Sequence, residues 1–180
     1  MPETTGAPGG GSTRLRARLA LYAAAATLLF LLERLLPNPV PWVRLGLANG
    51  VTLLVLLRHG PGAALAVLVL RLGLGGFFAG TLLGPQFLLA SSGGIASWAA
   101  MVLASRWGAL SALGLSVLGA CAHAAMQLLV VDIVFAAGHG MWDLLSLFLG
   151  LALVTGTLTG LLVDVLSSRL DLAEAERSAP

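Results

Sequence analysis

The chain has 180 residues, of which 58% are hydrophobic and 10% charged, and its mean hydropathy is +0.95. A soluble domain has about 45–50% apolar and about 25% charged residues, so this composition excludes a soluble globular protein and indicates an integral membrane protein. The formal net charge of +2 gives no reason to expect a nucleic-acid partner, and a single cysteine, Cys121, excludes an intrachain disulfide.

The N-terminal region combines a polar tail with a first hydrophobic segment. Residues 1–13 are rich in Gly, Pro, Ser and Thr, which predicts a disordered tail. Three arginines then precede the apolar run 19–32. That run is similar to a signal peptide, but it continues into Glu33 and Arg34 without a small-residue cleavage site. We therefore expect an uncleaved first transmembrane helix.

Six hydrophobic segments follow one another, separated by Pro, Gly and charged residues. Crossing a hydrocarbon core of about 30 Å takes about 20 helical residues. The segment 45–57 is short, so it requires local bilayer thinning or burial within the bundle. We predict an all-α membrane protein with a compact six-helix domain over 14–167, and a polar C-terminal tail over 168–180 with at most one or two more helical turns. The predicted spans are 15–36, 45–57, 61–80, 82–105, 110–137 and 141–166.

The arginines near the ends of these spans predict the orientation. Cytoplasmic loops carry an excess of positive residues, and seven arginines fall on the side of the N-terminus against two on the other side. Both termini are therefore predicted to be cytoplasmic. The seven are Arg14, Arg16, Arg18, Arg58, Arg106, Arg169 and Arg177, and the two are Arg34 and Arg44.

Small residues recur at a spacing of four, which on a helix makes a groove where a neighbouring backbone can approach closely. We interpret these pairs mainly as packing within the bundle, with a docking face for a partner protein as the alternative. The pairs are Ala20 with Ala24, Gly46 with Gly50, Gly76 with Gly80, and Gly156 with Gly160.

Polar side chains gather in the predicted outer half of the bundle. On the fifth segment, Ser116, His123 and Gln127 share one helical face, because separations of seven and four residues return to nearly the same angle. Two readings stay open: hydrogen-bonding glue between helices, including a satisfied interior histidine, or a polar pocket that opens outward. Asp132, nine residues from His123, points to nearly the opposite side. The other polar residues weighed in this way are Asn49, Gln86, Ser91, Ser92, Thr155, Thr157 and Thr159.

Arg71 lies near the middle of the third segment. A charged side chain there costs at least about 2.5–3.5 kcal/mol, so it needs either a structural partner or a function. An ion pair with Asp132 or Asp164 and contact with an anionic ligand are both open.

The loop before the second segment is Pro-rich, and a cation and an amide follow it. We predict that Trp42 covers a site whose lip carries Arg44 and Asn49, since hydrocarbon supplies no partner for such groups. The predicted substrate-binding residues are Trp42, Arg44, Asn49, Arg71, Gln86, Ser91, His123 and Gln127.

Four stretches of the chain resemble a known family: RLGLANGVT at 44–52, LRLGLGGFFAG at 70–80, FLLASSGG at 87–94 and GLSVLGACAHAAMQ at 114–127. They resemble the heptaprenyl diphosphate synthase component I family, also called the Gx transporter family, which is similar to the S components of energy-coupling factor (ECF) vitamin transporters. The resemblance covers roughly residues 18–166. The chain has Arg44 where that family has Lys, Ala124 where it has Asn, and Met126 where it has Gly.

The resemblance implies a protein of the bacterial cytoplasmic membrane and two classes of partner. One is an ECF-type coupling protein with its ATPases, docked on Ala20 and Ala24; the other is a soluble prenyl synthase subunit. The ligand would be vitamin-like, or a prenyl phosphate.

The motifs of an enzyme are missing from the sequence. Prenyl transferases bind Mg²⁺ through clustered aspartates, whereas Asp132, Asp143 and Asp164 are scattered, and there is no nucleotide-binding loop. We expect no metal, no cofactor and no catalysis by this chain alone. Two functions remain: a substrate-binding and transport subunit for a small, anionic and partly lipophilic molecule, open to the extracytoplasmic side and energised by a separate protein, or a non-catalytic accessory subunit of the synthase.

Overall fold

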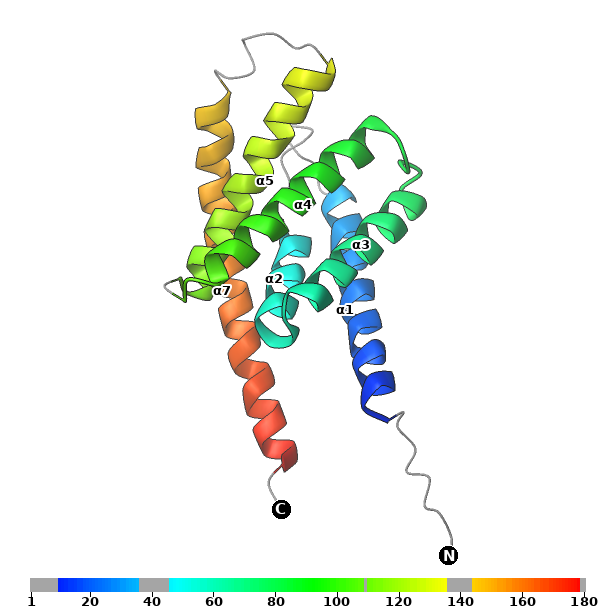
Figure 1. Cartoon of the computed structure of the whole chain (residues 1–180), viewed down its shortest axis with the longest axis vertical. Coiled ribbons are helices and arrows are strands. Elements are labelled where there is room, and N and C mark those ends of the chain that lie inside the picture. The colour runs from blue at the N-terminus through cyan, green and yellow to red at the C-terminus, as the bar shows by residue number, and fades with distance from the viewer. Residues whose placement is uncertain (1–9, 36–45, 109, 136–143, 179–180) are drawn as a thin grey trace, which may run out of the picture.

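The computed structural model describes residues 10–35, 46–108, 110–135 and 144–178. Every regular element in these ranges is a helix, and the helices pack together into a bundle (Figure 1). The predicted all-α, membrane-spanning class is confirmed. The helices are α1 (Gly10–Leu35), α2 (Leu47–His59), α3 (Pro61–Phe78), α4 (Pro85–Ser105), α5 (Ala112–Phe135) and α7 (Leu145–Ser178).

All of these helices except α2 are long and apolar enough to cross a bilayer. Their boundaries follow from local chemistry: α3 and α4 begin at Pro61 and Pro85, because the first turn of a helix needs no backbone N–H donor. Helix α2 begins after Gly46, whose left-handed φ of 76° ends any continuation from the preceding residues. The predicted division of the chain into six hydrophobic helices is therefore confirmed, with the inner boundaries correct to within a few residues, whereas α1 begins earlier and α7 ends later than predicted.

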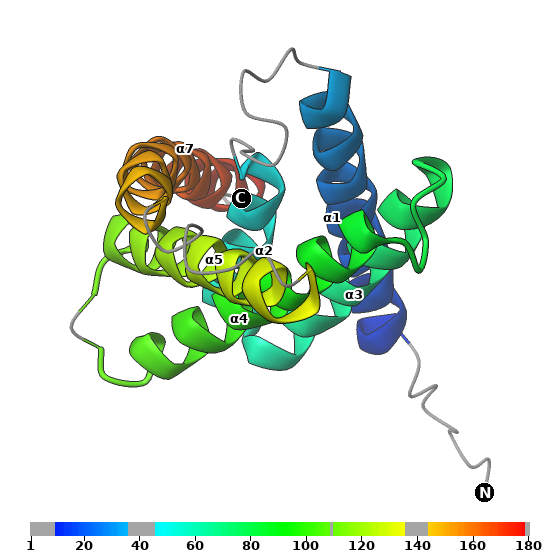
Figure 2. The same cartoon turned by 90° about the horizontal axis from the view of Figure 1, so that it is seen from above.

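Helix α2 is short because it lies inside the bundle. Its 13 residues span about 20 Å, roughly two-thirds of a hydrocarbon core. It contacts every other described helix, and Figure 2 shows it between α7 on one side and α1 on the other. Leu53, Leu54 and Val55 are buried. Burial within the bundle accounts for a helix of this length.

The start of α1 and the end of α7 lie at the same end of the bundle (Figure 1). The C-terminal ends of α1, α3 and α5 lie toward the opposite end, together with the start of α7. Part of the candidate site described below lies toward this end. We call this end of the bundle the distal end.

Glycine allows the closest helix contacts. A Cβ on Gly156 or Gly160 would lie 2.9 or 2.8 Å from a Cα atom of α5, so no side chain fits between the two helices. Gly50 packs in the same way against Thr159 of α7. These contacts support the interpretation as packing within the bundle. Ala20 and Ala24, by contrast, are exposed on α1.

The first and last helices are longer than predicted and extend into the regions expected to be tails. Helix α7 continues to Ser178, so the expectation of at most two further turns after residue 167 is wrong. Arg58 pairs with Asp171 and donates a hydrogen bond of 3.1 Å to the carbonyl of Ser167, and Leu170 packs against the core. These contacts hold the extra turns against the bundle. At the other end α1 begins at Gly10, so residues 10–13 are helical and only 1–9 lie outside the described residues.

Candidate functional site

Two adjoining cavities lie between the helices. One has a volume of about 160 Å³ and the other about 70 Å³. Gly46, Asn49, His123 and Gln127 line both, so these residues form the boundary between them. We call the larger one the charged cavity and the smaller one the hydroxyl cavity, after the side chains that line them.

The charged cavity takes its name from Glu33 of α1 and Arg71 of α3, each only 4% exposed. Gln86, in the first turn of α4, completes its polar wall. Arg71 Nη1 donates a hydrogen bond of 3.0 Å to Asn49 Oδ1. The acid that lines this cavity with Arg71 is Glu33, which we had not predicted, whereas the two aspartates considered as its partners do not line it.

Glu33 also caps the N-terminus of α2. Its Oε1 accepts a hydrogen bond of 2.5 Å from the backbone N–H of Leu47, the first residue of that helix. The first N–H groups of a helix have no partner within the helix, and a negative charge there is favoured by the helix dipole. No side chain at the N-cap position can do this, because that position is Gly46. Glu33 therefore fixes the part of α2 that carries Asn49.

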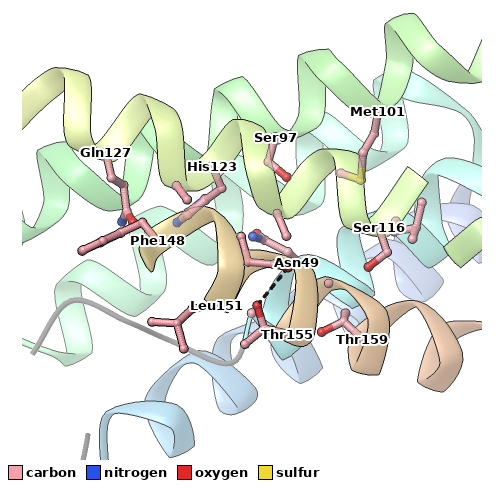
Figure 3. A pocket seen from close by; sticks show the side chains of 16 residues that line it. Asn49, Ser97, Met101, Ser116, His123, Gln127, Phe148, Leu151, Thr155 and Thr159 are labelled. Carbon is pink, nitrogen blue, oxygen red and sulfur yellow. Dashed lines mark hydrogen bonds between the residues drawn. The ribbon is translucent and has the colours of Figure 1, made fainter. Parts of the chain in front are cut away.

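The hydroxyl cavity is lined by four hydroxyl side chains and by apolar ones that include Met101, Phe148 and Leu151 (Figure 3). Thr155 is occupied locally, because its Oγ1 donates to the carbonyl of Ala152 at 3.4 Å, the dashed line in Figure 3. Ser97 differs: it is 1% exposed, and its Oγ has no hydrogen-bond partner among the described residues. The four hydroxyl residues are Ser97, Ser116, Thr155 and Thr159.

Two glycines of α4 let charged and polar groups approach its backbone. A Cβ on Gly93 would lie 2.8 Å from the imidazole of His123, and a Cβ on Gly94 would lie 3.5 Å from Arg71 Nη2. A side chain at Gly93 would therefore displace His123 from the boundary between the cavities.

A polar contact joins α1 to the start of α4 at the distal end. Arg34 Nη2 donates to Gln86 Oε1 at 3.1 Å, and Arg34 Nη1 donates to Thr81 Oγ1 at 3.4 Å. The hydrogen bond from Arg34 thus positions the Gln86 side chain, which also lines the charged cavity.

The structure brings five of the predicted site residues to the two cavities: Asn49, Arg71, Gln86, His123 and Gln127. Ser91 lines neither cavity, and its Oγ donates to the carbonyl of Leu88 at 3.1 Å. Trp42 and Arg44 lie outside the described residues.

The sequence reasoning did not select Glu33 or Ser97. Glu33 stands at the end of a hydrophobic segment, where a charged residue is ordinarily read as reaching water. A signal for Ser97 was available, since it follows Gly93 by four residues and so shares a helical face with it. In the part of the chain that the structure describes, no group of three or more His, Cys, Asp or Glu side chains could hold a metal ion.

Comparison with known proteins gives one match. A family model described as heptaprenyl diphosphate synthase component I matches residues 22–166. No curated protein and no solved structure matches the chain. Because the matched region covers most of the sequence and contains both cavities, the chain belongs to the heptaprenyl diphosphate synthase component I family.

Proposed function

We propose that the protein is a membrane-embedded binding subunit that holds a small molecule in the charged and hydroxyl cavities. The observation that carries this proposal is the convergence of Asn49, Arg71, Gln86, His123 and Gln127 on two adjoining cavities. These residues come from α2, α3, α4 and α5, which are well separated in the sequence.

The cavities favour binding over the simpler role of glue between helices. Hydrogen bonds that serve only to hold two helices together join side chains directly and need no space between them. Here Asn49 and Arg71 do bond to each other, but both also face a cavity of about 160 Å³. A cavity needs only about 10–15 Å³ of such space to hold one water, so the charged cavity has room for several waters or for a small polar molecule.

The charges of the site suggest how a ligand is recognised. Arg71 brings to the cavity a guanidinium, a group that binds carboxylates and phosphates, while its Nη1 also donates to Asn49. Glu33 lines the same cavity, so the local charge is balanced rather than strongly positive. This arrangement supports a ligand with one anionic group and a largely uncharged body, and it argues less for a multiply charged diphosphate.

We further propose that the cavities open to the extracytoplasmic side. The charged cavity lies toward the distal end, because Glu33 near the end of α1 and Gln86 in the first turn of α4 line it. The arginine distribution favours cytoplasmic termini at the opposite end. In this arrangement the protein receives its ligand from outside the cell. A separate energising protein would dock on α1, where Ala20 and Ala24 are exposed and small enough for a neighbouring helix to approach closely.

The family description favours a second candidate, a non-catalytic accessory subunit of a prenyl diphosphate synthase. In that case the chain would recruit a soluble catalytic subunit to the membrane. The last turns of α7 offer a surface for such a partner, since Asp171, Leu172 and Glu176 are exposed there.

Native mass spectrometry of the purified full-length protein separates the two candidates. We expect a retained small molecule in the wild type, lost in Asn49→Leu and kept in the control Ser91→Ala, because Ser91 lines neither cavity. A protein that retains nothing, yet co-purifies with a soluble Asp-rich synthase from its native membranes, would support the accessory role and refute the binding role. A second test is the double change Ala20→Leu/Ala24→Leu, which should block docking of an energising protein and leave ligand retention intact.

A further inference from the structure

Ser97 is the least explained polar group in the bundle. Its side chain lines the hydroxyl cavity, it is 1% exposed, and its Oγ has no partner among the described residues. Serine hydroxyls inside helices commonly bond to a carbonyl three or four residues earlier, as Ser91, Ser92 and Ser105 do on the same helix. Ser97 Oγ packs against Gly119 of α5, where a Cβ would lie 2.9 Å away, and a buried hydroxyl without a partner calls for a group that bonds to it.

The Arg71 side chain reaches α4 close to Ser97. Arg71 Nη2 lies where a Cβ on Gly94 would be 3.5 Å away, and Ser97 is three residues further along α4. Three residues are nearly one turn of a helix, so Gly94 and Ser97 lie on nearly the same face. Arg71 lines the charged cavity and Ser97 lines the adjoining hydroxyl cavity.

We propose that the ligand is a compact molecule with an anionic group at one end and a hydroxyl or amide group at the other. The inference rests on the proposed function and names the class of ligand for that site. Arg71 holds the anionic group in the charged cavity, and the body of the ligand passes the boundary formed by Asn49, His123 and Gln127. The uncharged polar group ends in the hydroxyl cavity, where Ser97 supplies its hydrogen bond.

The same geometry disfavours a long polyprenyl chain as the occupant. The hydroxyl cavity of about 70 Å³ has room for about two waters at liquid density, far less than such a chain needs. Hydrocarbon in this cavity would also leave the Ser97 hydroxyl without a partner in a dry environment, which is unfavourable.

Calorimetric titration of the detergent-solubilised full-length protein tests the inference with 4-hydroxybenzoate and 4-methylbenzoate. These probes share the carboxylate and the ring and differ only in whether a hydroxyl or a methyl group stands opposite. We expect the wild type to bind 4-hydroxybenzoate about 10-fold or more tightly than 4-methylbenzoate, because the methyl group leaves Ser97 unsatisfied. In Ser97→Ala the preference should fall to about threefold or less, whereas Ser91→Ala should keep it.

The outcomes separate this inference from the proposed function. Equal affinity of the wild type for the two benzoates, or a preference that survives in Ser97→Ala, overturns the inference and leaves a binding function in place. Tighter binding of geranyl diphosphate than of either benzoate, with no effect of Ser97→Ala, also overturns it. If none of these probes and no inorganic pyrophosphate binds, the proposed function itself fails. The comparison of the two benzoates on the wild type needs no variant, so it stands even if Ser97→Ala does not fold.

Discussion

Arg71 Nη1 donates a hydrogen bond of 3.0 Å to Asn49 Oδ1, which ties the middle of α3 to the first turns of α2. Both residues face the charged cavity, and Asn49 faces the hydroxyl cavity as well. The bond orients the side-chain amide of Asn49, which lies at the boundary between the two cavities. A buried cation in a membrane protein thus positions a neighbour while it remains next to the space where a ligand would bind.

Replacing Arg71 tests whether this cation binds the ligand. We expect Arg71→Met to abolish binding of 4-hydroxybenzoate and to lower the free energy of unfolding only modestly, because Met has a similar reach and removes a costly buried charge. Thermal denaturation with and without the probe measures both effects. A purely structural cation would instead cost about 3–5 kcal/mol on removal.

The acid involved can be identified by double variants of Arg71→Met. Glu33→Gln should restore any stability lost, because it removes the negative charge left in the same cavity. Asp132→Asn and Asp164→Asn serve as controls that should restore nothing. Recovery with either aspartate variant would contradict the assignment of Glu33.

Two variants of Glu33 separate the contribution of its charge from that of its hydrogen bond to Leu47. Glu33→Gln keeps an oxygen that accepts from the N–H of Leu47, whereas Glu33→Ala removes it. Loss of a helix cap costs about 0.5–2 kcal/mol, so Glu33→Ala should be less stable than Glu33→Gln by about that amount. Chemical denaturation of the two variants in detergent gives the difference. Equal stabilities would mean that the contact with Leu47 does not stabilise α2.

Adding a single methyl group at Gly93 should disturb the candidate site through His123. Gly93→Ala would place a Cβ 2.8 Å from the His123 ring, so the imidazole must move away from both cavities. We expect weaker binding of 4-hydroxybenzoate and a stability loss of about 1–3 kcal/mol from overpacking. Gly73→Ala is the matched control, since a Cβ there meets nothing within 4 Å. If both variants bind the probe like the wild type, His123 has no part in the site.

The contact of α7 with α5 depends on Gly160 in the same way. A Cβ at Gly160 would lie 2.8 Å from the Cα of Leu113, a backbone atom that cannot turn aside. Gly160→Ala should lower the unfolding free energy by about 1–3 kcal/mol, as expected for overpacking. On the same helix, Gly150→Ala meets nothing within 4 Å and should leave stability unchanged or slightly raised, because Ala is the better helix former. Similar melting temperatures for the two variants would argue against close packing at Gly160.

Much of the fold could be predicted from the sequence, because hydrophobic runs and their breaks at Pro and Gly are local properties. The six helices and the shared face of His123 and Gln127 follow from such patterns. Glu33 could not be identified in this way, since its role depends on which helix lies opposite, and Ser97 shares a helical face with Gly93 but nothing local shows that its hydroxyl lacks a partner. The extension of α7 was underestimated for the same reason: the contact of Arg58 with Asp171 joins residues far apart in the chain.

The central claim is that these polar residues line a water-accessible chamber and are not glue sealed between helices. Labelling of a single cysteine tests it: Gln127→Cys, in a chain where Cys121→Ala removes the natural thiol, is treated in intact cells with a charged, membrane-impermeant thiol reagent. We predict that Gln127→Cys is labelled and that excess 4-hydroxybenzoate slows the reaction. Val154→Cys, which is exposed on α7 and predicted to face lipid, should stay unlabelled because a thiolate does not form in hydrocarbon. Gln127→Cys that resists the reagent as fully as Val154→Cys would contradict the account.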